Sequence, residues 1–160
     1  MTKCLTFWDF SLSLYAQPEI ADCCLQLQDR YAGNVNIFLW SIWLGRRQVR
    51  LTDVRLTAAL ELIQQWDMDY VQVLRQLRRK MKYEFAQDLK LIAAVRESIK
   101  GAELKAEKRE QDWLEKLAEK WSVESVQLAE GENEAFYLNY LQLPQLLIEQ
   151  IKTKLKHDSN

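Results

Sequence analysis

The sequence predicts an all-α fold: a single-domain helical bundle of six to eight helices. Glycine (4) and proline (2) are scarce in the 160 residues, whereas an all-β fold needs many turn residues. Apolar residues recur at helical spacings of three and four along most of the chain. A composition of 48% hydrophobic and 28% charged residues is typical of a globular protein. We expect one domain over residues 1–156 and a frayed tail at 157–160.

The first helix is expected over residues 6–16, where Thr6 and Asp9 fit a capping box. The alternation from Ser11 to Leu14 would also suit a short strand. A second helix follows from Pro18, which is well placed at a first helical position.

A buried central helix is expected at about 35–44, because this segment is apolar on nearly every side. Gly33 is placed to end the preceding helix in a left-handed conformation, and Asn34 can cap the central helix. Thr52 can start the next helix. The acidic stretch 67–69 then predicts a break, with a new helix over about 69–82 capped by Asp69.

A long charged helix or helix pair is expected at about 84–121. As one helix its 38 residues would be roughly 57 Å long, which exceeds the diameter of a globule of this size. The helix therefore either breaks, most plausibly near Gly101, or protrudes as an arm. Two shorter helices are expected at 136–143 and 144–156.

Several segments together resemble a known family. FWDFSLSLY at 7–15 and LQDRYAGNVNIFLWSIWLG at 27–45 are the most specific, with the patterns FWDFSL and LQDxxxGxVNxxLxxxW. LRQLRRKMK at 74–82 and ESIKGAELKAEKREQDWLEKLA at 97–118 add to the likeness. The chain resembles a small bacterial family, mainly proteobacterial, known only as a domain of unknown function. The resemblance covers most of the first 120 residues. It implies a bacterial cytoplasmic protein and transfers no activity, cofactor or catalytic residue.

The sequence favours a non-enzymatic role. Its single histidine, His157, is four residues from the end, so no triad or His-containing metal cluster can be built on a rigid scaffold. Neither a P-loop nor a GxGxxG motif is present. We therefore predict no catalytic residue, no cofactor and no metal site. The alternative is a carboxylate or Mg²⁺ enzyme acting on a phosphate-bearing ligand, with Asp67 and Asp69 or Glu103 and Glu107 as ligands. The simpler interpretation places the two glutamates on a solvated helix face.

A basic face is the stronger functional candidate. Residues 46–82 carry nine Lys and Arg against four Asp and Glu, whereas residues 84–134 carry eight against thirteen. Clustered guanidinium groups suit phosphate or an acidic partner, or they could pair with the acidic long helix. The candidate binding face comprises Arg46, Arg47, Arg75, Arg78, Arg79 and Lys82.

A second candidate is a structural clasp between two helices, formed by Asp29, Gly33, Asn34 and Asn36. Asp29 is near the end of a helix, where the dipole disfavours a carboxylate. Backbone N–H groups of the next helix, Arg30 or an arginine of the basic face could compensate it. Asn36, inside a buried helix, needs hydrogen-bond partners of its own.

The leading expectation is a cytoplasmic, non-catalytic interaction or accessory module. Its partner would be another protein or a second copy, a homodimer forming through residues 99–121. The alternative is an RNA- or ribosome-associated factor that uses the basic residues of 46–82. No membrane association is expected, because the longest nearly apolar run is about half the length of a spanning helix. Three cysteines without a CxxC pattern are typical of reduced, buried thiols.

Overall fold

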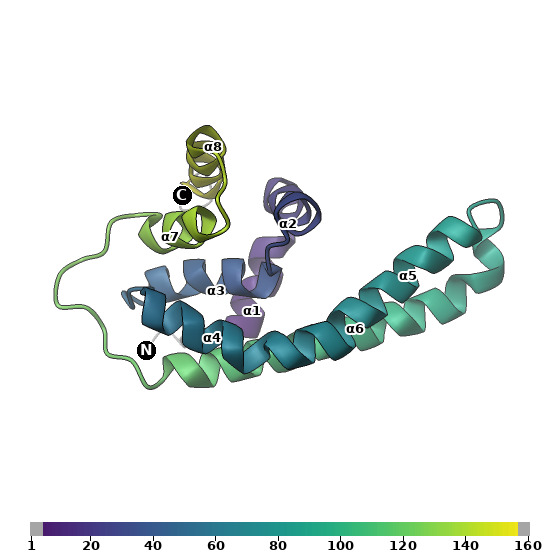
Figure 1. Ribbon diagram of the computed structural model, residues 1–160, viewed down its shortest axis with the longest axis horizontal. Helices are drawn as coiled ribbons and strands as arrows, with labels where there is room; N and C mark the ends of the chain where they lie inside the picture. Colours follow the sequence, from purple (N-terminus) through teal and green to yellow (C-terminus); the bar gives the residue numbers. More distant parts are fainter. Residues whose placement is uncertain (1–4, 157–160) are drawn as a thin grey trace.

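The computed structural model describes residues 5–156, which are all-α as predicted, with no strand in that range (Figure 1). A π-helical turn, Asp67–Val71, joins α4 to α5, and a 3-10 turn, Leu89–Ile92, precedes α6. The expected tail at 157–160 lies outside the described residues. The α-helices are α1 Phe7–Tyr15, α2 Pro18–Tyr31, α3 Val35–Arg46, α4 Asp53–Trp66, α5 Gln72–Glu84, α6 Ala93–Ala118, α7 Glu132–Tyr140 and α8 Gln145–Lys156.

Three helix starts are capped by the residues that the sequence indicates. The Thr6 hydroxyl accepts a hydrogen bond from the Asp9 N–H at 3.1 Å, and Thr52 accepts one from Arg55 at 3.3 Å. The Asn34 side chain accepts one from the Ile37 N–H at 3.1 Å. Each cap satisfies a donor that the first turn of a helix leaves free. The alternating segment from Ser11 is part of α1 and forms no strand.

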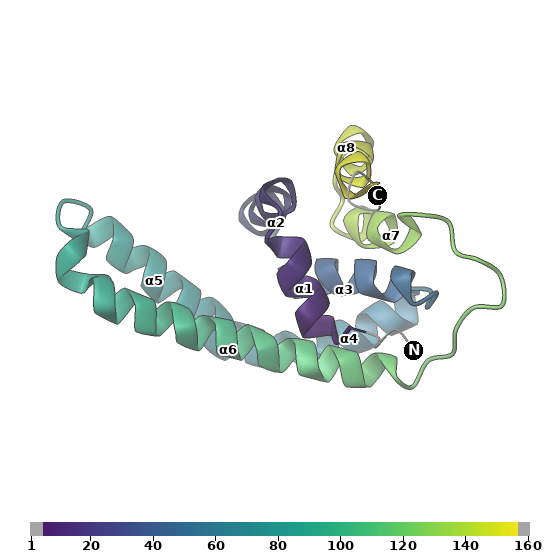
Figure 2. The ribbon, with the colours of Figure 1, turned by 180° about the vertical axis from the view of Figure 1, so that it is seen from behind.

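Helix α3 is the buried centre of the molecule, as expected. Its residues from Asn36 to Leu44 are all buried, and Phe38 and Trp40 are fully inaccessible. Helix α7 packs on one side of α3 and α6 on another, while α1 crosses between α2 and α6 (Figures 1 and 2). Each large apolar side chain buried in this way contributes about 1.5–3 kcal/mol to folding.

The C-terminal helices close the body over α3. Helix α7 begins at Glu132 rather than 136, directly after Gly131, whose φ of 75° is left-handed. Its Asn133 side chain accepts from the Leu51 N–H and donates to the Val49 carbonyl, both at 2.8 Å. Helix α8 then packs against α7 and α2.

The prediction that Gly33 adopts the left-handed conformation is wrong, because Ala32 adopts it, with φ of 50°. Glycine is favoured at position 33 for a different reason. A Cβ at this position would come within 2.9 Å of Leu141 Cδ1 and 3.3 Å of the Leu27 carbonyl oxygen. The close approach between the end of α2 and the chain after α7 therefore selects glycine here.

The predicted break at residues 67–69 is also wrong. The helix continues from α4 into α5 through the π-helical turn, in which the Gln72 N–H donates to the Asp67 carbonyl. Asp69 is not a cap, because its side chain accepts a hydrogen bond from Gln65. No glycine or proline interrupts this segment, so the chain passes through one wider helical turn and the helix does not end.

Helices α5 and α6 form an antiparallel arm that projects from the body (Figures 1 and 2). The predicted break near Gly101 is wrong, since α6 runs unbroken from Ala93 to Ala118. The segment 84–121 is nonetheless not one helix, because the chain reverses before Leu89. The 26 residues of α6 extend about 39 Å. Trp66 fastens the root of the arm by donating from Nε1 to the Ala106 carbonyl at 3.0 Å.

Replacing Gly101 by alanine should stabilise the protein. A Cβ there meets no heavy atom within 4 Å, and glycine inside a helix costs about 1 kcal/mol relative to alanine. We expect Gly101→Ala to raise the free energy of unfolding by about 1 kcal/mol in urea titrations. Gly33→Ala is the matched control and should lower it, because its Cβ is obstructed. A stabilised Gly33→Ala variant would contradict the close approach at the end of α2.

Candidate functional site

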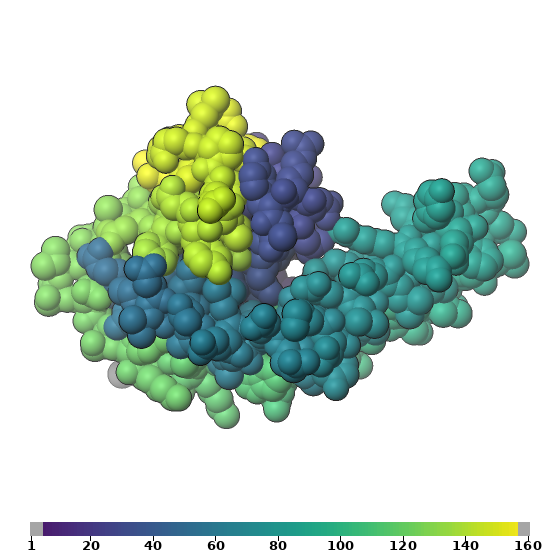
Figure 3. Space-filling model, viewed as in Figure 1, coloured from purple at the N-terminus to yellow at the C-terminus, as the bar shows by residue number. Residues whose placement is uncertain are grey.

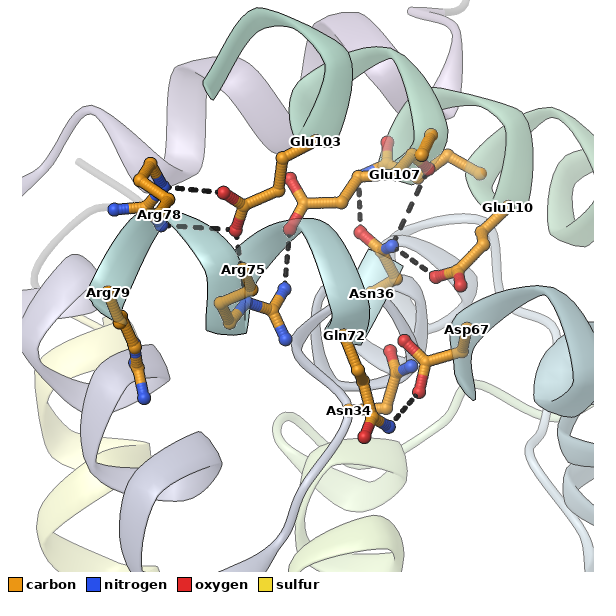
Figure 4. Close-up of polar contacts among 12 residues, drawn as sticks. Asn34, Asn36, Asp67, Gln72, Arg75, Arg78, Arg79, Glu103, Glu107 and Glu110 are labelled. Carbon is orange, nitrogen blue, oxygen red and sulfur yellow. Dashed lines mark hydrogen bonds and ion pairs between the residues drawn. The ribbon is translucent and has the colours of Figure 1, made fainter. Parts of the chain in front are cut away.

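A ladder of ion pairs joins α5 to α6 where the arm leaves the body (Figure 4). Arg75 donates from Nε to Glu103 at 3.1 Å and from Nη2 to Glu107 at 2.7 Å. Arg78 donates from Nε to the other Glu103 oxygen at 2.6 Å. Glu103 is only 5% exposed, so the interpretation of a solvated glutamate face is wrong for this residue. Two central arginines of the basic face thus pair with the acidic long helix, one of the outcomes that the sequence left open.

The ladder shifts the pKa values of its carboxyl groups in opposite directions. Burial would raise the pKa of Glu103, but the hydrogen bonds and positive charges of Arg78 and Arg75 outweigh it and lower this pKa. Burial raises the pKa of Glu107 and is only partly offset by Arg75. Glu103 therefore carries the firmer negative charge of the two.

A chain of buried polar side chains connects α1, α6 and α3. Ser11 donates to Gln111 Oε1 at 2.7 Å, and Gln111 Nε2 donates to Asn36 Oδ1 at 2.8 Å. Asn36 Nδ2 in turn donates to Glu110 Oε2 at 2.7 Å. All four side chains are less than 8% exposed. Buried polar groups in such a chain hold their helices in one register, because each loses its partner if a helix slides.

Glu110 is the most perturbed acid of this cluster. It is fully buried, and its Oε1 atom has no hydrogen-bond partner among the described residues. Its pKa is raised to about 8, chiefly by burial and also by the nearby charges of Asp67 and Glu107, although the Asn36 hydrogen bond and Arg75 act in the opposite direction. Buried acids with displaced pKa values, and π-helical turns such as the one that contains Asp67, are both frequent at functional sites.

Two residues of the predicted clasp contact the backbone through their side chains, because Asn34 caps α3 and Asn36 Nδ2 donates to the Glu107 carbonyl at 3.5 Å. Asn36 binds the side chains of Gln111 and Glu110. Asp29 accepts from Arg79 at 2.8 Å in a pair whose side chains are each 48% exposed, so an arginine of the basic face compensates it. Gly33 lines the same cavity as Asn34 and Asn36.

The predicted basic face is not one surface. Arg46 and Arg47 are at the end of α3 remote from Asn36, where Arg47 lies over the Trp43 ring at 4.5 Å. Lys82 is exposed near the tip of the arm, whereas Arg75, Arg78 and Arg79 face the body. These six residues were predicted to form one face because all of them belong to the basic segment 46–82.

Two hollows flank the polar cluster. A groove of about 410 Å³ lies between the arm and helices α1 and α2, where Figure 3 shows a recess. Four large apolar side chains in it are 41–46% exposed, and three arginines and Lys100 also line it. The apolar four are Leu12, Tyr15, Leu25 and Leu104. A smaller cavity of about 260 Å³ lies between the start of α3, the π-helical turn and α5.

Sequence reasoning missed Ser11, Glu110 and Gln111. The latter two lie in the charged run 105–112, which looks like a solvated surface. The spacing was the available signal, because Glu103, Glu107 and Glu110 recur at steps of four and three on one side of a helix. Neither carboxylate pair considered for Mg²⁺ belongs to a group of three His, Cys, Asp or Glu that could hold a metal ion within residues 5–156.

These features lie within the part of the chain that a family model matches. A family model described as protein of unknown function (DUF2390) matches residues 6–114, and the chain belongs to that family. The resemblance to a family of unknown function is thereby confirmed. The matched span contains the ion-pair ladder and the buried polar chain, and it stops before α7 and α8. No curated protein and no solved structure matches the chain. No helix within residues 5–156 is both long and apolar enough to cross a membrane.

The clasp residues should differ sharply in their effect on stability. Asn36→Ala leaves buried groups of Glu110 and Gln111 unpaired, so we expect a loss of about 3 kcal/mol. Asp29→Ala removes only an exposed ion pair and should cost less than about 1 kcal/mol. Thermal and urea unfolding of both variants measure the difference. Equal losses would contradict the division between a buried network and a surface pair.

Glu110 should make the protein less stable as the pH rises. Its folded pKa of about 8 exceeds its ordinary value of 4.5, so its stabilising contribution is full below pH 4.5 and is lost as the pH rises through 8. Glu110→Gln should therefore melt higher than the wild type at pH 8–9, and this advantage should shrink toward pH 4.5. Melting curves across this pH range test it, with the exposed Glu119→Gln as control. Parallel profiles for wild type and Glu110→Gln would refute the raised pKa.

Proposed function

We propose that the protein is a non-catalytic interaction module that binds an acidic, amphipathic helix of a partner protein in the groove between its arm and body. The observation that carries this proposal is the groove itself. Its apolar side chains come from three helices: Leu12 and Tyr15 from α1, Leu25 from α2 and Leu104 from α6. Apolar residues gathered from separate helices around one concave surface suit the apolar face of a docked helix.

The charges around the groove favour an acidic occupant. Four cationic residues line it, namely Arg75, Arg78, Arg79 and Lys100, against the two acidic residues Glu103 and Glu107. Arg75 and Arg78 are bound to these glutamates and Arg79 is bound to Asp29, so Lys100, which forms no ion pair within residues 5–156, supplies the free positive charge. Carboxylates flanking the apolar anchors of the partner would meet this charge and steer the encounter. The sequence also suggested a homodimer through residues 99–121. Ala106, Leu114 and Ala118 in this stretch are buried within the chain and are not free for such an interface.

Site-specific photo-crosslinking in cells tests the groove. A crosslinker at Leu104 or Leu25 should capture an acidic protein, whereas one at Val54, which is 80% exposed on α4, should not. Leu12→Asp should abolish the product formed from position 104, and Val54→Asp should leave it intact. Capture of a second copy would replace the proposed partner with self-association. Absence of any groove-specific product would overturn the proposal.

A second candidate is nucleic acid binding by the tip of the arm. A cavity of about 390 Å³ between the ion-pair ladder and the tip is lined by Arg78, Lys90, Arg96 and Lys100, with Glu97 as its acidic residue. Lys90, Arg96 and Lys100 form no ion pair within residues 5–156, and the buried Nε of Arg96 lacks a hydrogen-bond partner in that range. Clustered cations of this kind suit phosphodiester groups.

Fluorescence anisotropy with a single-stranded RNA 20-mer tests the tip. Contacts to three phosphates predict that log affinity falls with log salt concentration at a slope of about −2. Lys90→Gln with Lys100→Gln should weaken binding and flatten that slope. Lys116→Gln with Lys120→Gln, which changes the same charge at the other end of α6, should do neither. If the two double variants weakened binding equally, RNA would be held only by non-specific electrostatic attraction, and the proposed site on the arm would be wrong.

The cellular setting is part of the same proposal. The buried, unpaired thiols of Cys23 and Cys24 support a reducing compartment, and burial raises the pKa of Cys24 to about 12. Together with the family resemblance, this favours the bacterial cytoplasm. Cys4, the third cysteine, lies outside the described residues.

A further inference from the structure

The smaller cavity beside the groove carries charges of both signs at different places on its wall. Its volume is about 260 Å³, and Asn36, Arg75, Arg79 and Glu107 line both hollows. Asp67 and Glu110 line only the smaller one. Figure 4 shows the carboxyl group of Glu110 turned toward Asn36 and that of Asp67 turned toward Gln72, with Arg75 and Arg79 on the other side of Gln72.

The carboxyl groups of this cavity are incompletely paired. Glu110 is fully buried, and its Oε1 has no hydrogen-bond donor within residues 5–156. The Gln72 amide donates to only one oxygen of Asp67. A buried acceptor without a partner is unfavourable, so a donor that reaches it is bound favourably.

The positions of the carboxyl groups in this cavity favour one kind of hydrogen-bond donor. No three acidic, histidine or cysteine side chains of the described chain are placed to hold a metal ion. An ammonium group fits better, because it brings three N–H donors and a positive charge to acceptors on two different helical segments. At the other side, Arg75 uses Nε and Nη2 for Glu103 and Glu107, and Arg79 uses Nη2 for Asp29. The remaining N–H groups of these guanidiniums can receive a carboxylate.

We propose that this cavity binds a small zwitterion of the α-amino-acid class, with its ammonium group between Glu110 and Asp67 and its carboxylate against Arg75 and Arg79. The proposal concerns a ligand distinct from the protein partner of the groove, and it does not depend on that partner. Because Asn36, Arg75 and Glu107 form the shared wall, an occupied cavity also fixes one side of the groove.

Binding of the zwitterion changes the protonation of Glu110. Without the ligand, burial and the charges of Asp67 and Glu107 raise the pKa of Glu110 to about 8, although Asn36 and Arg75 act in the opposite direction. Glu110 is therefore mostly protonated at pH 7. An ammonium group beside it favours the carboxylate. Binding at pH 7 therefore releases a proton from Glu110, and binding at pH 9 releases none.

Isothermal titration calorimetry of the full chain tests the proposal with glycine, alanine, glutamate and arginine as probes. Titrations at each pH in two buffers whose ionisation enthalpies differ, PIPES and imidazole at pH 7 and borate and CHES at pH 9, give the number of protons released. We expect saturable binding of at least one amino acid, release approaching one proton at pH 7 and none at pH 9. Ethylammonium and acetate, each of which carries one of the two charges, should bind at least tenfold more weakly.

Two variants separate binding from folding. Glu110→Gln should weaken binding at least tenfold and abolish proton release. Arg79→Gln, at a half-exposed position where the fold is tolerant, should weaken binding while leaving proton release intact. Glu119→Gln is the matched control and should bind like the wild type. No saturable heat with any probe at 10 mM, ethylammonium binding as tightly as the amino acids, or unchanged binding in Arg79→Gln would each overturn the proposal.

Discussion

The arrangement of the helices depends on the buried hydrogen-bonded chain from Ser11 through Gln111 and Asn36 to Glu110. Its members come from α1, α6 and α3, so one set of bonds fixes three helices relative to one another. Apolar contacts around α3 supply most of the free energy of burial, but they tolerate small slides of a helix. Directional bonds between buried groups do not, because each displaced partner leaves an unpaired polar atom.

The arm follows from this anchoring. With α6 held against α3 at Asn36, its N-terminal half projects beyond the body, and α5 packs along it in the opposite direction. Arg75 and Arg78 bridge the two helices near the root through Glu103 and Glu107. Beyond this ladder Lys80 pairs with Glu84, whereas Lys90, Arg96 and Lys100 form no ion pair within residues 5–156.

The groove and the smaller cavity meet at the wall formed by Asn36, Arg75 and Glu107. The same side chains therefore serve stability and shape two surfaces available for binding. Glu110 illustrates the cost of this arrangement, since a fully buried carboxyl with a free oxygen destabilises the fold at neutral and alkaline pH. Buried acids with a displaced pKa are frequent at functional sites, which makes Glu110 a candidate site residue.

The sequence by itself determined the all-α fold, the buried helix around Trp40 and the caps at Thr6, Asn34 and Thr52, because helical periodicity and capping are local. It also identified Asn34 and Asn36 as polar residues that would form hydrogen bonds at the start of the buried helix. It misplaced the break at 67–69 and the role of Gly33, since a π-helical turn and the contact with Leu141 depend on segments brought together by folding. Only the tertiary structure decided that Glu103 and Glu110 are buried and that Arg46 is remote from Arg75. A charged residue carries no local mark of burial; its environment is set by the helices that pack against it.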